Sequence, residues 1–136
     1  MFDACLVPAK TIVTAKGDGA PLDVSAASNP IFLVTLSITD VVEQESIEIT
    51  LFTSPDGTTW DAKAAATFPQ KFYVGEYPLL VDLSAAAGAK FLRAHWEMNR
   101  WGRGPTAAKF EFGLRIREVS REALQEAHAE AQARQT

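Results

Sequence analysis

Apolar and polar side chains alternate with a period of two through most of this 136-residue chain, and turn-forming residues interrupt the alternation at intervals of about ten residues. A period of two places successive side chains on opposite faces of a β-strand, so that one face is buried and the other meets solvent. Helical spacing is absent before Val119. The pattern therefore predicts an all-β fold, an antiparallel sandwich of about eight strands.

Segment 109–118 shows the clearest alternation, because Phe110, Phe112 and Leu114 share one face, and this predicts a strand that is central or well covered on its apolar face. Trp96 falls on the apolar face of segment 91–99 and is predicted to lie in the core. The two strands on either side of the acidic loop 40–45 are expected to form a hairpin, and residues 17–19 are expected to form a turn. The predicted strands are residues 11–15, 21–25, 30–40, 46–53, 65–72, 77–83, 91–99 and 109–118.

The pattern becomes helical after Glu118. Ser120 can cap a helix by accepting a backbone N–H, and Glu122 lies in the first turn, where the helix dipole favours negative charge. The sequence therefore predicts a β-sandwich domain at residues 1–118 and a short C-terminal α-helix or tail at residues 119–136. Leu124 is the only large side chain on the apolar stripe of this helix. The segment is either a solvated tail or docks on a neighbouring subunit through Leu124.

The composition, 47% apolar and 22% charged residues, is sufficient for one domain with a substantial core. No apolar run reaches the roughly 18 residues that a membrane-spanning helix needs. The N-terminal residues lack the basic start and apolar core of a secretory signal, so we expect the protein in the cytoplasm or in an assembled particle. Cys5 is the single cysteine, which excludes an internal disulfide.

Charge is unevenly distributed along the chain. Residues 1–89 contain 4 Lys or Arg and 11 Asp or Glu, a net charge of −7, whereas residues 90–136 contain 9 and 6, a net charge of +3. An acidic chain of this kind does not favour duplex nucleic acid as its main partner. The acidic first part and the basic last part permit head-to-tail contact between copies, in which the acidic stretch 40–48 of one copy would contact a basic surface of another.

The sequence offers little for catalysis. His95 and His128 are the only histidines, and neither has a nucleophile or metal-ligand partner at a recognisable spacing. Gly102 and Gly104 stand between two predicted strands, not before a helix, so they do not form a phosphate-binding loop. We therefore expect no catalytic residue, no cofactor and no metal site, and we do not expect an enzyme.

The most unusual segment is the loop that follows segment 91–99, because Arg100, Trp101 and Arg103 lie beside two glycines. Trp and Arg dominate binding energy at protein interfaces, and the same groups suit a sugar, a phosphate or a stacked base. The alternative is that Trp101 packs over the end of the sandwich while the arginines pair with acidic residues. Tyr73 is a second candidate contact, because Phe72 and Tyr73 are adjacent and one of them should face outward.

Two short sequence segments resemble a known family. Residues 54–60, Ser-Pro-Asp-Gly-Thr-Thr-Trp, and residues 89–93, Ala-Lys-Phe-Leu-Arg, resemble a turn and the strand that follows it in discoidin-like, galactose-binding-like jelly rolls. Similar turns occur in phage tail and head-decoration proteins. The resemblance implies an eight-stranded jelly roll that binds glycans, lipids or proteins through loops at one end. The chain departs from that family in lacking its paired terminal cysteines, and Trp60 is expected to be a buried structural residue.

These observations favour a non-enzymatic structural or interaction protein, a self-associating subunit of a larger, phage-like assembly. Its expected partner-binding residues are Tyr73, Arg100, Trp101, Arg103 and Leu124. The alternative is a carbohydrate-binding jelly-roll module, with a glycan in place of the protein partner.

Overall fold

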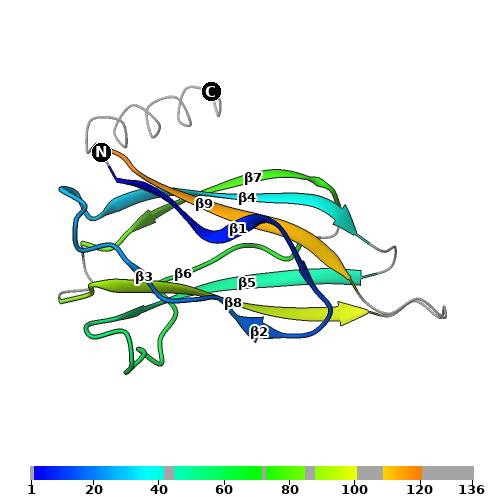
Figure 1. Cartoon of the computed structure of the whole chain (residues 1–136), viewed down its shortest axis with the longest axis horizontal. Coiled ribbons are helices and arrows are strands. Elements are labelled where there is room, and N and C mark those ends of the chain that lie inside the picture. Colours follow the sequence, from blue (N-terminus) through cyan, green and yellow to red (C-terminus); the bar gives the residue numbers. More distant parts are fainter. Residues whose placement is uncertain (1, 42–44, 72, 85–87, 101–108, 121–136) are drawn as a thin grey trace, which may run out of the picture.

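The computed structural model describes residues 2–41, 45–71, 73–84, 88–100 and 109–120, and these residues form two packed antiparallel β-sheets (Figure 1). The part of the chain so described contains no helix. The strands are β1 (Asp3–Val13), β2 (Gly17–Asp18), β3 (Leu22–Asp23), β4 (Ile31–Val41), β5 (Glu45–Ser54), β6 (Ala66–Thr67), β7 (Gly75–Asp82), β8 (Phe91–Arg100) and β9 (Phe110–Glu118). The predicted all-β sandwich is confirmed.

The first sheet has the order β1-β9-β4-β7, and the second has the order β2-β8-β5-β6, with β3 also paired to β8. All pairings are antiparallel. Figure 1 shows the first sheet as the upper layer and the second as the lower layer. Each sheet buries its apolar face against the other sheet, so the apolar positions of the alternating pattern form the core.

The core is made by the inward-facing set of each long strand. Phe110, Phe112 and Leu114 of β9 are buried, and β9 lies between β1 and β4, so the predicted central strand is confirmed. Trp96 of β8 is buried as predicted, and its ring meets that of Phe112 edge-to-face at 5.6 Å between centroids. This contact joins the two sheets, and each fully buried side chain of this size stabilises the fold by about 1.5–3 kcal/mol.

The expected hairpin of residues 30–40 and 46–53 is wrong. The two strands exist as β4 and β5, but β4 pairs with β7 and β9 in the first sheet, whereas β5 pairs with β6 and β8 in the second. Alternation fixes only which face of a strand is buried, not which strand lies beside it. Placing the strands in opposite sheets turns the apolar faces of both toward the same core.

The N-terminal prediction was also incomplete, because β1 begins at Asp3 rather than at residue 11. Irregularities in its pairing with β9 lie between Cys5 and Val7 and between Val7 and Thr11, and Lys10 has a φ of 60°. Such bulges break the period of two that identifies a strand. The expected turn at residues 17–19 is likewise wrong in part, since Gly17–Asp18 form β2 against Trp96 and His95.

Two further predictions concern segments of which the structure describes only part. Residues 65–72 were expected to form one strand, but only Ala66–Thr67 do so, with a separate bridge between Lys71 and Ile47. Of the predicted helix at 119–136, only Val119 and Ser120 are described, so that prediction lies outside the described residues. The residues that the structure describes include no helix long and apolar enough to span a membrane.

Candidate binding surfaces

The turn at residues 54–60 is held by its own side chains. Ser54 Oγ accepts hydrogen bonds from the backbone N–H groups of Asp56 (3.2 Å) and Gly57 (2.9 Å). Asp56 Oδ1 accepts from the N–H groups of Thr58 (2.9 Å) and Thr59 (2.8 Å). These bonds, the one from Thr59 first, hold the pKa of the Asp56 carboxyl far below its usual range. Gly57 has a φ of 81°, a conformation that residues with a side chain rarely adopt.

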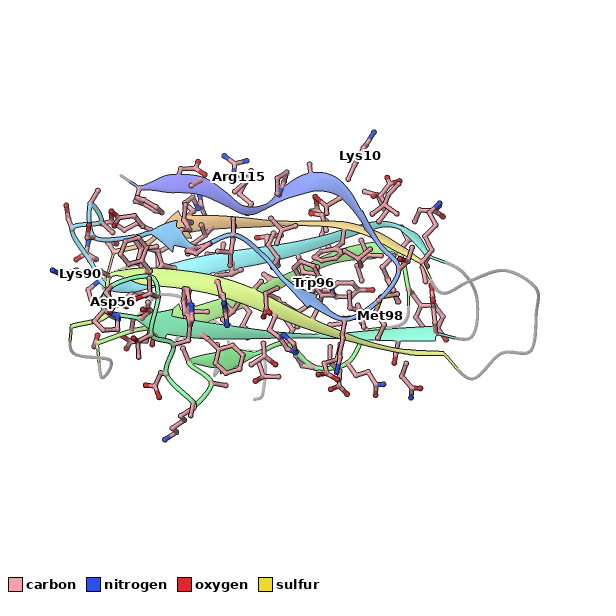
Figure 2. All side chains as sticks on the ribbon, turned by 60° about the horizontal axis from the view of Figure 1, so that its bottom comes forward. Lys10, Asp56, Lys90, Trp96, Met98 and Arg115 are labelled. Carbon is pink, nitrogen blue, oxygen red and sulfur yellow. The ribbon has the colours of Figure 1, made fainter. Side chains whose placement is uncertain are left out.

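The two segments that carry the family resemblance, residues 54–60 and 89–93, lie side by side in the structure. Ser54 pairs with Phe91 at the start of β8, and the backbone N–H of Lys90 donates to the carbonyl of Ser54 at 2.9 Å. Figure 2 shows Asp56 and Lys90 at the same end of the sandwich. The turn is therefore anchored on β8, and it places Trp60 beside that strand.

Trp60 is only partly buried, which corrects the expectation of a buried structural residue. Its ring lies against the side chain of Arg93 on the outer face of β8, with the guanidinium carbon 4.3 Å from the ring centroid. The turn carries Trp60 past the end of the core to this outer face, where solvent reaches part of the ring. A cation–π contact at such a site is worth about 0.5–1 kcal/mol.

The Arg93 guanidinium stacks on Trp60 without a hydrogen bond to any residue that the structure describes. Its nearest acid is Asp18 of β2, whose Oδ1 lies 3.8 Å from the Arg93 Nε, beyond hydrogen-bond range. The side chain is 28% exposed. Its Nε is buried, and no described residue accepts a hydrogen bond from the guanidinium.

His95, two residues further along β8, lies between two carboxylates. Its Nδ1 is 2.8 Å from Asp18 Oδ1 and its Nε2 is 3.1 Å from Glu97 Oε1. Ionised carboxylates only accept hydrogen bonds, so both contacts are satisfied at once only when both ring nitrogens carry protons. Burial, the largest single influence, opposes the charge, but the bonds to Glu97 and Asp18 outweigh it and raise the pKa of His95.

Phe52 of β5 completes this surface, with its ring edge-to-face against the His95 imidazole at 6.3 Å between centroids. Sequence reasoning placed His95 on an outer face correctly but found no partner for it, because Asp18 is 77 residues away in the chain. We call the surface the Arg93 face. It consists of Asp18, Phe52, Trp60, Arg93, His95 and Glu97.

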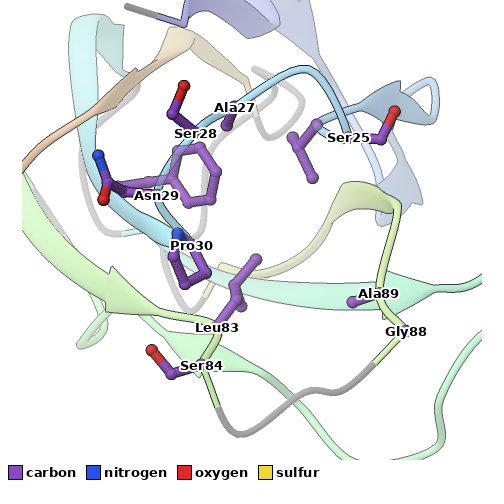
Figure 3. Close-up of a pocket in the computed structure, with 11 residues that line it drawn as sticks. Ser25, Ala27, Ser28, Asn29, Pro30, Leu83, Ser84, Gly88 and Ala89 are labelled. Carbon is purple, nitrogen blue, oxygen red and sulfur yellow. The ribbon is translucent and has the colours of Figure 1, made fainter.

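A pocket of about 280 Å³ lies between the β3–β4 and β7–β8 connections (Figure 3). Its lining includes the apolar side chains of Val24, Phe32 and Leu83 beside polar side chains. Several of these polar groups are already engaged, since the Ser25 hydroxyl donates to Asp23 and the Ser84 hydroxyl donates to Asp82. The pocket thus offers few uncommitted hydrogen-bonding groups to a ligand.

Glu118 fixes the loop on one side of this pocket. Its buried carboxylate accepts hydrogen bonds from the backbone N–H groups of Phe2, Ser28 and Asn29 and from the Asn29 amide, at 2.9–3.2 Å. Burial alone would raise the pKa of Glu118, but these four bonds together lower it below its usual value. The carboxylate therefore ties the N-terminus and the β3–β4 loop to the end of β9.

Of the partner-binding residues expected from the sequence, Tyr73 and the backbone of Arg100 are described, and both lie at the opposite end of the sandwich, where β8 finishes at Arg100. The backbone of Arg100 pairs with Glu45, and its side chain is outside the described residues, as are Trp101, Arg103 and Leu124. Tyr73 precedes β7 at this end and is 75% exposed, which confirms that one of the adjacent residues Phe72 and Tyr73 faces outward.

Two exposed apolar residues at this end were missed in the sequence. Val74 is 58% exposed beside Tyr73, and Ile12 is 55% exposed near the end of β1. The register joins Ile12 to Glu111 at the start of β9 and Ile38 to Gly75 at the start of β7, so both lie toward the end at which β8 finishes. We call this region the Arg100 end; Met98, nearby on β8, is labelled in Figure 2 opposite Asp56 and Lys90.

The acidic stretch 40–48 is less available as a counterpart surface than expected. The Lys109 ammonium lies 3.0 Å from Asp40, and the carboxylate of Glu45 is buried and accepts the backbone N–H of Lys109 at 3.0 and 3.2 Å. Both acids thus hold the start of β9 in place.

Among the side chains that the structure describes, no group of three or more His, Cys, Asp or Glu is placed to hold a metal ion. Comparison of the sequence with models of known protein families and with curated proteins found no match.

Proposed function

We propose that this chain is a non-enzymatic structural or interaction protein, a self-associating jelly-roll subunit of a larger assembly of the kind found in phage particles. The observation that carries the proposal is the exposure of Ile12, Tyr73 and Val74 at the Arg100 end, with Ile12 on one edge strand of the first sheet and Tyr73 and Val74 just before the other. These are the large apolar side chains that the described part of the chain leaves exposed.

The strand order supports the jelly roll. β2 and β3 both pair with β8, so they can be taken as one interrupted strand. The chain then passes repeatedly between the two sheets, and its first and last strands, β1 and β9, are neighbours. Two nested Greek keys, which define a jelly roll, give this connectivity.

The apolar residues at the Arg100 end support association through side chains. Covering an exposed Val or Tyr side chain on a partner removes apolar surface from water and contributes about 1.5–3 kcal/mol for a residue that becomes fully buried. Trp101 and Arg103, which are expected as contacts from the sequence, closely follow Arg100 in the chain.

The edge strands of the first sheet also favour association through side chains at the Arg100 end over pairing of these strands between copies. β1 is interrupted by pairing irregularities, and β7 contains Pro78, which cannot donate a backbone hydrogen bond. Both features hinder the addition of a strand from another copy at these edges. Contact through the end of the sandwich avoids them.

Sedimentation velocity of the full chain over a range of concentrations tests the proposal. We expect the parent to associate reversibly and Val74→Lys to shift it toward the monomer, because a lysine there places charge on the apolar surface. Ala26→Lys is the matched control, since Ala26 is exposed and lies between β3 and β4, toward the other end. A parent that stays monomeric, or equal association of both variants, contradicts the proposal.

A further inference from the structure

We propose that a second copy of this chain pairs with the edge of β8 at residues 97–100, antiparallel, so that one sheet continues across two molecules. The inference rests on the proposed self-association and deepens it, because it names a backbone contact through which two copies meet. The evidence is an uncovered segment of β8 whose hydrogen-bonding groups complement those of the same segment in a second copy.

The neighbours of β8 leave residues 97–100 uncovered on one side. β5 pairs with β8 along its whole length, whereas on the other side β3 pairs with its first two residues and β2 pairs with His95 and Trp96. No described strand pairs with residues 97–100 on that side. In the connection before β2, the Ala15 carbonyl accepts the indole N–H of the buried Trp96 at 3.1 Å. That connection is therefore drawn toward the core and not along the edge.

The backbone groups of Met98 and Arg100 point to the open side. Directly opposed residues of an antiparallel pair alternate between those that bond to each other and those whose groups point away. The Ala94 carbonyl accepts from the backbone N–H of Gly19 at 2.8 Å, so Ala94 faces β2, and every second residue after it faces the same side. Met98 lies near the end of β8 (Figure 2). Among the described residues, none bonds to the outward groups of Met98 or Arg100.

The other edges of the two sheets are covered or interrupted. On the far side of the second sheet, the backbone N–H groups of Asp61, Ala65 and Phe68 donate to carbonyls of β5 at 2.8–3.0 Å. In the first sheet, β1 carries pairing irregularities and β7 carries Pro78. The end of β8 contains no proline, and its pairing with β5 is regular, so an added strand meets regular geometry there.

A second copy of the same segment fits this edge. A two-fold axis at Asn99 places Met98 of each copy opposite Arg100 of the other, and each such pair exchanges two hydrogen bonds, which satisfies the outward groups of both residues. Asn99, whose side chain is exposed, then lies directly opposite its own copy. An amide both donates and accepts, so two copies of it can bond to each other, whereas a charged residue at the axis would repel its copy.

The open edge belongs to the Arg100 end. Two copies paired antiparallel at residues 97–100 extend in opposite directions from the junction, so their Arg100 ends face each other. Ile12, 55% exposed near the end of β1, lies at this end, and the pairing brings it toward the second copy. The pairing alone is a small contact, so it adds to the apolar contacts of this end and does not replace them. These features favour a second copy over an unrelated peptide.

Disulfide crosslinking of the full chain tests the pairing. In a Cys5→Ser background, Asn99→Cys supplies the only cysteine. Opposed residues of this kind of pair have Cβ atoms about 4.5–5.5 Å apart, which is close enough for a disulfide after a small adjustment. Glu48→Cys is the matched control, because Glu48 is exposed on the same face of the sheet but lies on β5, one strand further from the edge.

Under mild oxidation, at a concentration where sedimentation shows association, we expect Asn99→Cys to form a covalent dimer roughly tenfold or more faster than Glu48→Cys. Backbone hydrogen exchange of the parent gives a second measurement. We expect the Met98 and Arg100 amides to exchange roughly tenfold more slowly at high protein concentration than at low. The Leu80 amide, on the edge strand β7 of the first sheet, should not change.

The outcomes separate this inference from the proposed function. If the parent associates but Asn99→Cys crosslinks no faster than Glu48→Cys, the strand pairing is overturned while self-association stands. The same holds if the exchange of Met98 and Arg100 does not depend on concentration in a parent that associates. A parent that stays monomeric at every concentration overturns both.

Discussion

Asp18 Oδ1 lies 2.8 Å from His95 Nδ1, and this contact joins the two-residue strand β2 to the long strand β8. So short a strand contributes few backbone hydrogen bonds, and the side-chain contact reinforces its position. The other ring nitrogen of His95 meets Glu97, while Arg93 faces Asp18 from the same strand. The protonation state of one imidazole therefore affects how firmly β2 is held.

Stability should decrease as the pH rises through the titration of His95. The pKa of His95 is raised in the folded state above its ordinary value of 6.5, so the folded state binds the proton more tightly than the unfolded state. The stabilising contribution is full below pH 6.5 and is lost as the pH passes the higher folded value. His95→Gln should lack this part of the pH dependence. Thermal unfolding of both proteins from about pH 5 to about pH 9 measures the difference, and parallel curves would refute it.

Glu118→Gln should destabilise the fold. The amide keeps the shape of the side chain but replaces a charged acceptor that receives four hydrogen bonds with a neutral group that also carries donors. The lowered pKa of Glu118 has a second consequence: its contribution is present above its ordinary value of 4.5 and is lost as the pH falls through the folded value. We expect a lower melting temperature for Glu118→Gln near neutral pH and no change for Glu76→Gln, whose side chain is exposed. Equal melting temperatures would contradict this role.

The two described tryptophans should differ in their effect on stability. Trp96 is buried between the sheets, so Trp96→Ala should lower the free energy of unfolding by about 3–5 kcal/mol. Trp60 is partly exposed and contacts Arg93 from outside the core, so Trp60→Ala should cost only about 1 kcal/mol. Urea unfolding of both variants checks the order, and a larger loss for Trp60→Ala would place that ring in the core after all.

The sequence predicts the long strands well because each carries enough alternating residues to show which face is buried. Trp96 and the face of β9 that carries Phe112 are recovered in this way. The same signal says nothing about neighbours, which is why β4 and β5 were taken as a hairpin although they lie in different sheets. β1 was largely missed, because its irregular pairing buries both Leu6 and Val7 in succession.

The candidate sites also differ in how far the sequence predicts them. The sequence predicts that one of the adjacent residues Phe72 and Tyr73 faces outward, and Tyr73 is exposed. The Arg93 face has no local signal, because Asp18, Trp60 and Arg93 come from distant parts of the chain and meet only through the pairing of β2 and β5 with β8. Only the register of the second sheet brings them together.

Self-association through the Arg100 end is tested most directly by size-exclusion chromatography with light scattering on the parent and on the double variant Tyr73→Ser/Trp101→Ala. The account predicts that the parent elutes with a mass that rises above the 14.8 kDa monomer as its concentration increases, while the variant keeps its fold and stays at the monomer mass. A parent that remains at the monomer mass at every concentration, or a variant that associates as the parent does, would contradict it.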